Sequence, residues 1–334
     1  MVATATAVKF GTRGSKLAMG QTQQIADRLA AVGGFAADLV TVRTDGDVLT
    51  GSLSQMGGTG VFATALRAAV LDGRVDVAVH SLKDLPTAAA PGLTMAAIPA
   101  RVDPRDALCS RDGLSLTGLP QGAKVGTGSP RRAAQLLAAR PDLRIMDIRG
   151  NVDTRLARVP GLPGNPEAPV MPGKTGDLDA VVLAAAGLSR LGRLDAVGEF
   201  LEPAVMLPAP GQGALAVECR SEDSAAHGST AVLAQALAAV DDTDTRLSVT
   251  AERALLARLE AGCAAPVGAY AFRKGSMLHL EAVVCSLDGQ RSLRLKKATD
   301  GLTDVGATLL GIELAEQLLA DGAGDLADLA GTSK

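Results

Sequence analysis

The stretch VDVAVHSLKDLP, from Val75 to Pro86, places a short apolar run directly before a charged loop. The run over 75–79 is typical of a strand buried in a sheet. Lys83 and Asp84 follow at the carboxyl end of this strand, where open α/β sheets usually bind their ligands. A Lys–Asp dipeptide alone is typical of a solvated pair, but in this place it is a candidate for acid–base chemistry and carboxylate binding. His80 is expected to be a structural histidine, and we assign it no role.

Strand-like and helix-like stretches alternate on both sides of this segment. The expected strands lie at 7–12, 37–44, 75–79, 123–126, 143–148, 179–184 and 213–218. The expected helices lie at 16–31, 61–71, 129–139, from 151 onward and at 241–260. The C-terminal part adds strands at 267–272 and 278–286 and then helices from 302. This alternation predicts an α/β protein whose sheets carry helices on both faces.

Residues 159–176, VPGLPGNPEAPVMPGKTG, depart from this rhythm because they contain five prolines and four glycines. Neither a helix nor a central strand tolerates that composition. We expect a long surface excursion here, and a tolerated insertion is favoured over a functional lid.

The composition argues against several classes of protein. A net charge of −3 gives no electrostatic footprint for nucleic acid or an anionic membrane. The four cysteines are widely spaced, without a CxxC pair or a His at ligand spacing, so we expect neither a metal site nor a disulfide framework. No apolar run approaches the roughly 20 residues of a membrane helix, and the N-terminal residues lack the features of a secretion signal. We therefore expect a soluble, cytoplasmic protein.

Basic residues concentrate in loops that follow a strand or open a helix. In GTRGS, Arg13 and Ser15 precede the first expected helix, where a hydroxyl cap and the helix N-terminus favour an anion. In GTGSPRR, a Gly-rich turn enters a helix whose first turn carries Arg131 and Arg132. Cations at a helix N-terminus oppose the helix dipole, so an anionic ligand is expected to resolve the conflict.

Two further segments extend this pattern. Arg149 ends an expected strand in RGNVDTR, Arg155 lies on the helix that follows, and Arg190 lies in GLSRLG. Up to six arginines and Lys83 are therefore expected to converge on a cleft between two α/β units. Such a cluster would repel itself unless it held a ligand with several carboxylates or phosphates. The Walker P-loop and the GxGxxG fingerprint are both missing, so neither nucleotide class is supported.

Laid end to end, these motifs resemble those of the hydroxymethylbilane synthases, also called porphobilinogen deaminases. The segments that carry the resemblance run over nearly the whole chain: GTRGSKLA, GGTGVF, VDVAVHSLKDLP, DPRDAL, GTGSPRR, RGNVDTR, GLSRLG, PAPGQGALAVECR and TAERALLARLEAGCAAPVGAY. HSLKDLP, RGN, PAPGQGA and EAGC are together highly specific. The resemblance implies a transferase of tetrapyrrole, and hence porphyrin and haem, biosynthesis.

The resemblance also implies an α/β fold of three domains. The first two are expected to be similar to the lobes of type II periplasmic binding proteins, over 1–101 with 205–220 and over 102–204. The second lobe would include the Pro-rich insertion at 159–176. The third, over 221–334, is expected to be a small α/β domain that carries Cys263.

The resemblance further assigns a cofactor and a site. Cys263, which in isolation would be an ordinary core residue, matches the cysteine that holds a dipyrromethane through a thioether. On this covalent primer the family joins four molecules of porphobilinogen, with loss of ammonia, and then releases linear hydroxymethylbilane by hydrolysis. Asp84 is the expected catalytic residue. The expected cofactor-binding residues are Cys263, Lys83, Asp84, Thr127, Ser129, Arg131, Arg132, Arg149 and Gly150, and the expected substrate-binding residues are Arg13, Ser15, Arg149, Arg155 and Arg190.

Two features depart from the family pattern. Many members have a Lys where Thr59 stands in the loop over 57–60, so the resemblance carries no anion-binding role to that position. The segment over 159–176 is also longer than the usual family connection.

A monomer is the family expectation. A two-lobed solute-binding protein is the main alternative and an enzyme acting on nucleotides or phosphoryl groups a weaker one, and neither predicts covalent modification of a cysteine.

Overall fold

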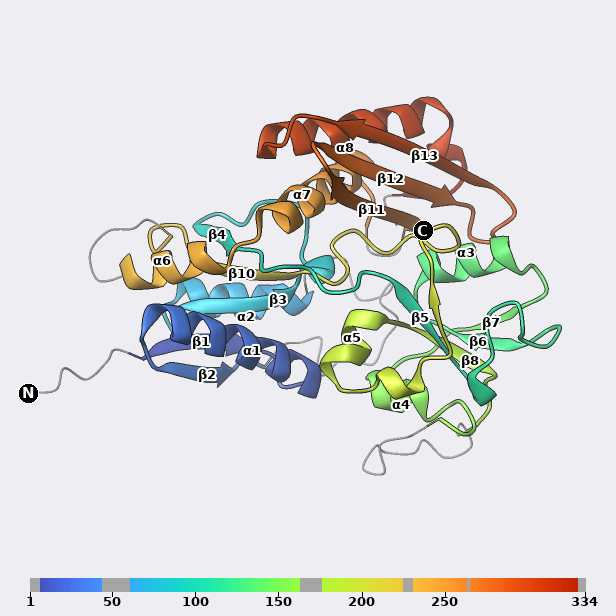
Figure 1. Ribbon diagram of the computed structural model, residues 1–334, viewed down its shortest axis with the longest axis horizontal. Helices are drawn as coiled ribbons and strands as arrows, with labels where there is room; N and C mark the ends of the chain where they lie inside the picture. The colour runs from blue at the N-terminus through green and yellow to red at the C-terminus, as the bar shows by residue number, and fades with distance from the viewer. Residues whose placement is uncertain (1–6, 44–60, 163–175, 225–230, 263–264, 330–334) are drawn as a thin grey trace, which may run out of the picture. The chain divides into compact units, whose positions relative to one another are not determined.

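The computed structural model describes residues 7–43, 61–162, 176–224, 231–262 and 265–329 (Figure 1). The chain forms two compact units, one made of Met1–Val102 with Ala214–Val249 and the other of Asp103–Gly213 with Thr250–Lys334. Cys263, Thr59 and residues 163–175 of the Pro-rich segment lie outside the described residues. The predictions made for them therefore stay predictions.

The first unit is built on a five-stranded sheet with the order β2-β1-β3-β10-β4. Its strands are β1 (Val8–Thr12), β2 (Ala37–Thr41), β3 (Val77–Ser81), β4 (Leu93–Ala97) and β10 (Leu215–Arg220). β1 pairs in parallel with β2 and β3, whereas β10 runs antiparallel to β3 and β4. The first strand after the chain returns to this unit is thus inserted between β3 and β4.

Helices cover both faces of this sheet, as the alternation of the sequence predicts. The helices are α1 (Lys16–Gly33), α2 (Val61–Leu71) and α6 (Ala231–Val240). Val77 and Val79 of β3 belong to the buried cluster that contains α1 and α6. Ala78, between them, belongs to the cluster that contains α2. Because successive strand residues point to opposite faces, the two clusters lie on the two sides of the sheet.

The second unit repeats this topology, with the strand order β7-β6-β8-β5-β9. Its strands are β5 (Asp106–Ser110), β6 (Lys124–Gly126), β7 (Arg144–Met146), β8 (Ala180–Ala184) and β9 (Glu199–Leu201). β6 is parallel to β7 and β8, and β5 is antiparallel to β8 and β9. β5, the first strand after the chain enters this unit, takes the place that β10 has in the first. The helices are α3 (Pro130–Ala139), α4 (Val152–Leu156) and α5 (Ala185–Arg190).

The C-terminal part of the second unit is a three-stranded antiparallel sheet with a helix packed on it. Its strands are β11 (Val267–Lys274), β12 (Met277–Cys285) and β13 (Ser292–Thr299), and its helix is α8 (Asp304–Ala320). A further helix, α7 (Thr243–Arg258), belongs to the first unit up to residue 249 and to the second from residue 250. The predicted fold class, two similar α/β lobes with a small C-terminal α/β part, is confirmed. No helix in the described part of the chain is both long and apolar enough to cross a membrane.

Two of the differences from the sequence-based expectation lie in the first unit. β3 covers Val77–Ser81 rather than 75–79, because the amide of Val75 donates to the carbonyl of Ala69 at 3.1 Å in the turn that closes α2. α6 was not expected, and its residues Leu233 and Leu237 pack in the core of the first unit. The predicted third domain over 221–334 includes this helix, and the three predicted domain ranges stay a prediction.

Candidate functional site

Lys83 and Asp84 lie on a single 3-10 turn, Leu82–Asp84, directly after β3. Leu82 and Leu85, on either side of this pair, are buried and belong to one apolar cluster. The amide of Leu82 donates to the carbonyl of Ala214 at 3.1 Å. These anchors hold the turn at the strand end and leave the Asp84 side chain exposed to solvent. The position predicted for the catalytic carboxylate is thus a fixed turn rather than a loose loop.

Asp84 lines a small cavity of about 40 Å³ in the first unit. Its polar lining consists of Arg13, Gln21, His80, Ser81 and Asp84. The structure therefore brings two of the predicted site residues, Arg13 from the end of β1 and Asp84, to one place. Ser15 instead caps a helix, because it is the N-cap of α1 and its hydroxyl accepts from the amide of Ala18 at 3.2 Å.

His80, which lines this cavity, also belongs to a buried ion-pair network. Its Nε2 is 3.1 Å from Oε2 of Glu218, on the neighbouring strand β10. Arg67 of α2 donates to both oxygens of the same carboxylate, at 2.9 and 2.8 Å. Burial would raise the pKa of Glu218, but the interactions with His80 and Arg67 outweigh burial and lower it to about 2.

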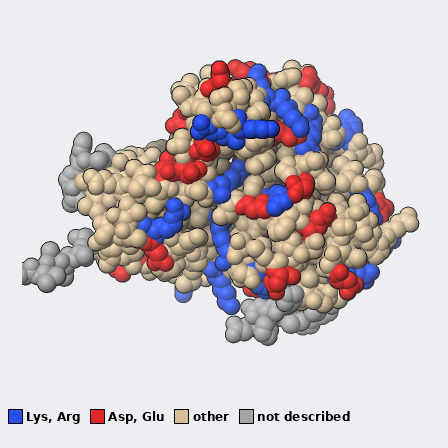
Figure 2. All heavy atoms as spheres, in the orientation of Figure 1, with Lys and Arg blue, Asp and Glu red and all other residues tan. Residues whose placement is uncertain are grey.

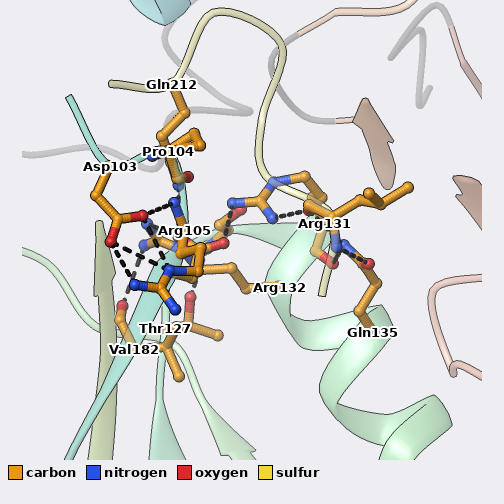
Figure 3. A network of polar contacts seen from close by, with 12 residues as sticks. Asp103, Pro104, Arg105, Thr127, Arg131, Arg132, Gln135, Val182 and Gln212 are labelled. Atoms are coloured by element: carbon orange, nitrogen blue, oxygen red, sulfur yellow. Dashed lines mark hydrogen bonds and ion pairs between the residues drawn. The ribbon is translucent and has the colours of Figure 1, made fainter. Parts of the chain in front are cut away.

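In the second unit, the N-terminus of α3 carries two buried arginines that share one carboxylate (Figure 3). Nη2 of Arg131 is 2.8 Å from Oδ2 of Asp106. Nε and Nη2 of Arg132 donate to Oδ1 of Asp106 at 3.0 and 2.8 Å. The amide of Gln212 donates to the same Oδ1 at 2.9 Å. Two guanidinium groups, one amide and one fully buried carboxylate thus form a closed network.

Asp106 changes the interpretation of the two arginines. Burial would raise the pKa of Asp106, but the charges of Arg131 and Arg132 and the hydrogen bonds to the carboxylate hold it well below its usual range. The sequence predicts that an anionic ligand offsets the two cations at the helix N-terminus. The structure corrects this, because Asp106 supplies that anion from β5. A role of Arg131 and Arg132 in binding the cofactor stays a prediction.

The same network fixes the segment over 207–212. Nη1 of Arg131 donates to the carbonyl of Leu207 at 2.5 Å. The amide of Gln135 donates to that carbonyl at 3.0 Å and accepts from the Leu207 amide at 2.8 Å. Gln212 also donates to the carbonyl of Pro104 at 2.8 Å. The chain enters the second unit near residue 103 and leaves it near residue 213. The hydrogen bonds of Gln212 link these two segments to each other within the unit.

Thr127 and Ser129 form the turn into α3. Oγ1 of Thr127 accepts from the amide of Ser129 at 3.2 Å. Ser129 is the N-cap residue of α3, yet its side chain makes no capping hydrogen bond. Its hydroxyl, half-buried at a helix N-terminus, is therefore a donor that the helix itself does not use.

A second basic group lies around the start of α4. It consists of Arg149 and Arg155, with Gly150 between them in the sequence. Gly150 has φ 105°, a value that strongly favours glycine, and its carbonyl accepts from Nε of Arg155 at 2.8 Å. Arg149 is exposed, with its Nη2 3.6 Å from Oδ2 of Asp147. Burial, together with the charges of Arg132 and Arg149, lowers the pKa of Arg155 to about 10.

The pKa of Arg190, at the end of α5, is also lowered. Burial of the guanidinium lowers it to about 10. Nη2 donates to the carbonyl of Gly213 at 2.9 Å, while Nε has no hydrogen-bond partner in the described part of the chain. Among the described residues, neither Arg155 nor Arg190 has a carboxylate within ion-pair distance. In the described part of the chain neither guanidinium is in an ion pair, which is the condition under which an anionic ligand is bound favourably.

These two arginines differ from the usual arrangement of charge on this protein. On the face drawn in Figure 2, basic and acidic side chains lie interspersed. Typical pairs are Arg294 with Glu281, 2.6 Å apart, and Lys297 with Glu313, 2.8 Å apart. In the described residues, no group of three or more His, Cys, Asp or Glu side chains is arranged to hold a metal ion.

The fold and these side chains define a class: an α/β protein of two similar lobes, with a carboxylate at a strand end of one unit and, in the other, arginines that have no ion pair among the described residues. The particular family follows from comparison with known proteins. The family model for the porphobilinogen deaminase dipyromethane cofactor binding domain matches residues 8–228, and the model for the C-terminal domain matches residues 246–320. The chain belongs to the porphobilinogen deaminase family.

Similar proteins agree over nearly the full length. The chain is 54% identical to the porphobilinogen deaminase of Micrococcus luteus, over 95% of this chain and 93% of that one. It is 56% identical to that of Cutibacterium acnes, over 97% of both chains. It is 52% identical to that of Mycobacterium marinum, over 96% of both. The alternatives of a solute-binding protein and of a nucleotide enzyme are thereby set aside.

Solved structures resemble the chain more distantly. A periplasmic substrate-binding protein of an ABC transporter from Coxiella burnetii is 17% identical, with a TM-score of 0.41, over 70% of this chain and 91% of that one. The methionine-binding protein MetQ is 16% identical, with a TM-score of 0.39, over 69% of this chain and 89% of that one.

The sequence analysis assigned no role to three residues of these networks. Asp106 lies in the DPRDAL motif and Gln212 in PAPGQGA, so the motifs marked their positions but not their roles. Glu218 lies in a strand pattern, and nothing in the sequence connects it to His80. Each partnership joins residues distant in sequence, which only the folded chain reveals.

Proposed function

We propose that this chain is a hydroxymethylbilane synthase, a transferase that joins four porphobilinogen molecules into linear hydroxymethylbilane on a dipyrromethane bound to Cys263. Membership of the porphobilinogen deaminase family supports the activity. The observation that carries the substrate class is that Arg155 and Arg190 are partly buried without an ion pair among the described residues. Porphobilinogen bears an acetate and a propionate, so each ring added brings two more carboxylates that such arginines bind.

The residues of the second unit fit the cofactor that the family implies. A dipyrromethane carries several carboxylates, and Arg149, Arg155 and the Ser129 hydroxyl offer donors to anions. When bound, this group supplies the primer to which rings are added. Arg131, Arg132 and Thr127 complete the proposed cofactor-binding set, together with Lys83 and Gly150. Arg131 and Arg132 act while held by Asp106, so their guanidinium planes are fixed in advance of binding.

Asp84 is the proposed catalytic residue. Loss of ammonia from porphobilinogen leaves a cation conjugated with the pyrrole ring, and a nearby carboxylate stabilises this charge. The same carboxylate accepts a hydrogen bond from the pyrrole N–H. Its 3-10 turn is anchored by Leu82 and Leu85, so the carboxylate is held in place before the charge develops. Arg13, which lines the cavity beside Asp84, is the proposed partner of a substrate carboxylate, with Ser15 as a further member of the substrate-binding set.

The remaining parts of the proposal concern the whole molecule. We propose a cytoplasmic monomer, with porphobilinogen as its small-molecule partner and no nucleic-acid or membrane partner. Two lobes, over 1–101 with 205–220 and over 102–204, and a third domain over 221–334 make up the proposed division. A gel-filtration experiment combined with light scattering checks the monomer.

Asp84→Ala tests the catalytic assignment. We expect turnover of porphobilinogen to fall by at least about 100-fold, because the charge that stabilises the cation is lost, while the free energy of unfolding stays within about 1 kcal/mol of the wild type. Asp72→Ala is the matched control, since Asp72 is an exposed aspartate of the same unit. If the Asp84 variant turned over porphobilinogen at near-normal rates, the assignment would be wrong.

A further inference from the structure

His80 is a buried, titratable side chain beside the proposed catalytic carboxylate, and the function proposed above gives it no role. It lies on β3, is 7% exposed and is followed four residues later by Asp84. An imidazole is the side chain whose charge changes most readily near neutral pH. Burying its polar ring is unfavourable unless the ring nitrogens have partners. The contacts of His80 therefore bear on its role.

Glu218 and Arg67 fix the orientation of the His80 ring. Nε2 lies 3.1 Å from Oε2 of Glu218, and that carboxylate is itself held at both oxygens by Arg67. With Nε2 facing a carboxylate at this distance, the proton of the neutral ring is placed on Nε2, and Nδ1 keeps its lone pair. The carboxylate also stabilises the imidazolium that forms when Nδ1 accepts a proton. The arrangement suits a base that takes up and releases a proton.

His80 is among the residues that line the same cavity as Asp84. This cavity, of about 40 Å³, has room for at least one water molecule. Its polar wall, with Gln21, Ser81 and Arg13, supplies the hydrogen-bond partners that a confined water needs. A water in this position would connect the carboxylate of Asp84 with the imidazole of His80.

We propose that His80, oriented by Glu218 and Arg67, is a positioning residue that exchanges a proton with Asp84 through water in the cavity they share. The inference rests on the proposed catalytic role of Asp84. Each ring addition forms a carbon–carbon bond and breaks the C–N bond of porphobilinogen and the C–H bond at the attacked ring carbon. Starting from the ammonium form of porphobilinogen, it therefore releases ammonia and one proton. Asp84 takes this proton, water passes it to Nδ1 of His80, and the proton then leaves with ammonia as ammonium. Asp84 is thereby ionised again for the next ring.

Several charged groups surround His80, and all of them enter its titration. Glu218 faces it from β10 and Arg67 from α2. Asp84 and Arg13 line the same cavity as His80. Lys83 lies on the turn next to Asp84. Of these groups, Asp84 is the one that takes part in the proposed reaction. A substitution at Asp84 therefore tests whether its charge affects the protonation of His80.

The direct test is an NMR titration of the imidazoles in the intact protein, which has only three histidines. Wild type is compared with Asp84→Asn. Removing the negative charge of Asp84 destabilises the imidazolium, so we expect the His80 midpoint to move to lower pH by about 0.5 unit or more. The midpoint of His279, in the C-terminal sheet, should not move. An unchanged His80 midpoint, or a His80 that takes up no proton between about pH 5 and 9, overturns the proposal.

A second variant separates proton exchange from simple support. In His80→Gln the side-chain amide still donates to Glu218 but cannot carry a proton. We expect kcat to fall by about 100-fold with KM changed less than about 3-fold. We also expect the low-pH limb that the imidazole gives to the kcat profile to disappear. In Glu218→Gln, the imidazolium loses its carboxylate and this limb should move to lower pH. A His80→Gln enzyme with the wild-type kcat and pH profile overturns the proposal.

Failure of this proposal is distinguishable from failure of the proposed function. If wild type does not consume porphobilinogen, the proposed function fails, and the NMR titration still reports whether His80 and Asp84 are coupled. If wild type consumes porphobilinogen and Asp84→Asn leaves the His80 midpoint unchanged, only the proton exchange fails. Should His80→Gln not fold, the titration and the Glu218→Gln profile decide the matter.

Discussion

Oδ2 of Asp106 lies 2.8 Å from Nη2 of Arg131, and the other oxygen of the same carboxylate binds Arg132. Asp106 is fully buried, and both arginines are nearly so. The first strand of the second unit thereby carries the counter-ion of α3, the helix whose N-terminus we propose to bind the cofactor. The Asp106 carboxylate thus stabilises this unit and also holds the two arginines of the proposed site in a fixed orientation.

Asp106→Asn should destabilise the protein strongly. The substitution keeps the shape but leaves two buried guanidinium groups without a counter-ion, a change that costs about 3–5 kcal/mol. Urea unfolding measures it. Asp103→Asn is the matched control: its ion pair with Arg105 is partly exposed, and its loss should cost about 1 kcal/mol or less. Equal losses in the two variants would show that the buried network contributes no more than a surface pair.

Glu218 predicts how stability depends on acid. Its pKa is lowered to about 2 in the folded protein, from an ordinary value of 4.5, so its ionised form is favoured by folding. A depressed folded pKa contributes stability that is fully present above about pH 4.5 and is lost as the pH falls toward 2. We expect wild type to exceed Glu218→Gln by about 3 kcal/mol near neutral pH, with the difference shrinking over this window. Unfolding curves at several pH values test this, and a difference independent of pH would contradict it.

Arg155→Gln and Arg190→Gln should separate function from stability. Both arginines are partly buried without a carboxylate partner in the described residues, so neutralising them should change the free energy of unfolding by about 1 kcal/mol or less. Porphobilinogen turnover should nevertheless fall, with elongation stalling at different ring numbers in the two variants. Intact-mass analysis of the enzyme during turnover resolves the stalled species.

Arg132→Gln is the comparison for this pair. Arg132 is matched by Asp106, so its loss should cost stability as well as activity. If all three variants lost only initial substrate binding, and to the same extent, the proposed division of labour among the arginines would be contradicted.

Much of the fold could be predicted from local pattern. Apolar periodicity and the Ser15 cap located α1 to within two residues at its C-terminal end. The long helix α7 and the strands β11 and β12 were also expected near their observed bounds. These elements carry their signal within their own sequence. The strands β4, β9 and β13 were missed, because their place is defined by the neighbouring strands of the sheet rather than by a pattern in their own sequence.

The resemblance to a known family proposes Asp84, Arg131 and Arg155 as site residues, and these roles stay predictions. The sequence could not supply the contacts of these residues. No local signal states that Arg131 pairs with Asp106, whereas Arg155 has no carboxylate within ion-pair distance among the described residues. That difference depends on which strand lies beside each helix, a property of the folded chain.

Three cysteines are unsuited to compete for a covalent group. Cys109, Cys219 and Cys285 are buried, and burial raises the pKa of their thiols to about 12, 11 and 11. A thiolate is the reactive form of cysteine, so these three should remain unmodified in the folded protein. A covalent cofactor should therefore map to Cys263 alone.

The most direct measurement is the intact mass of the purified protein beside that of Cys263→Ser, with peptide mapping of any adduct. We predict an added dipyrromethane on Cys263 in wild type and none in the variant. An unmodified wild-type chain that still gains no mass when given porphobilinogen would contradict the account.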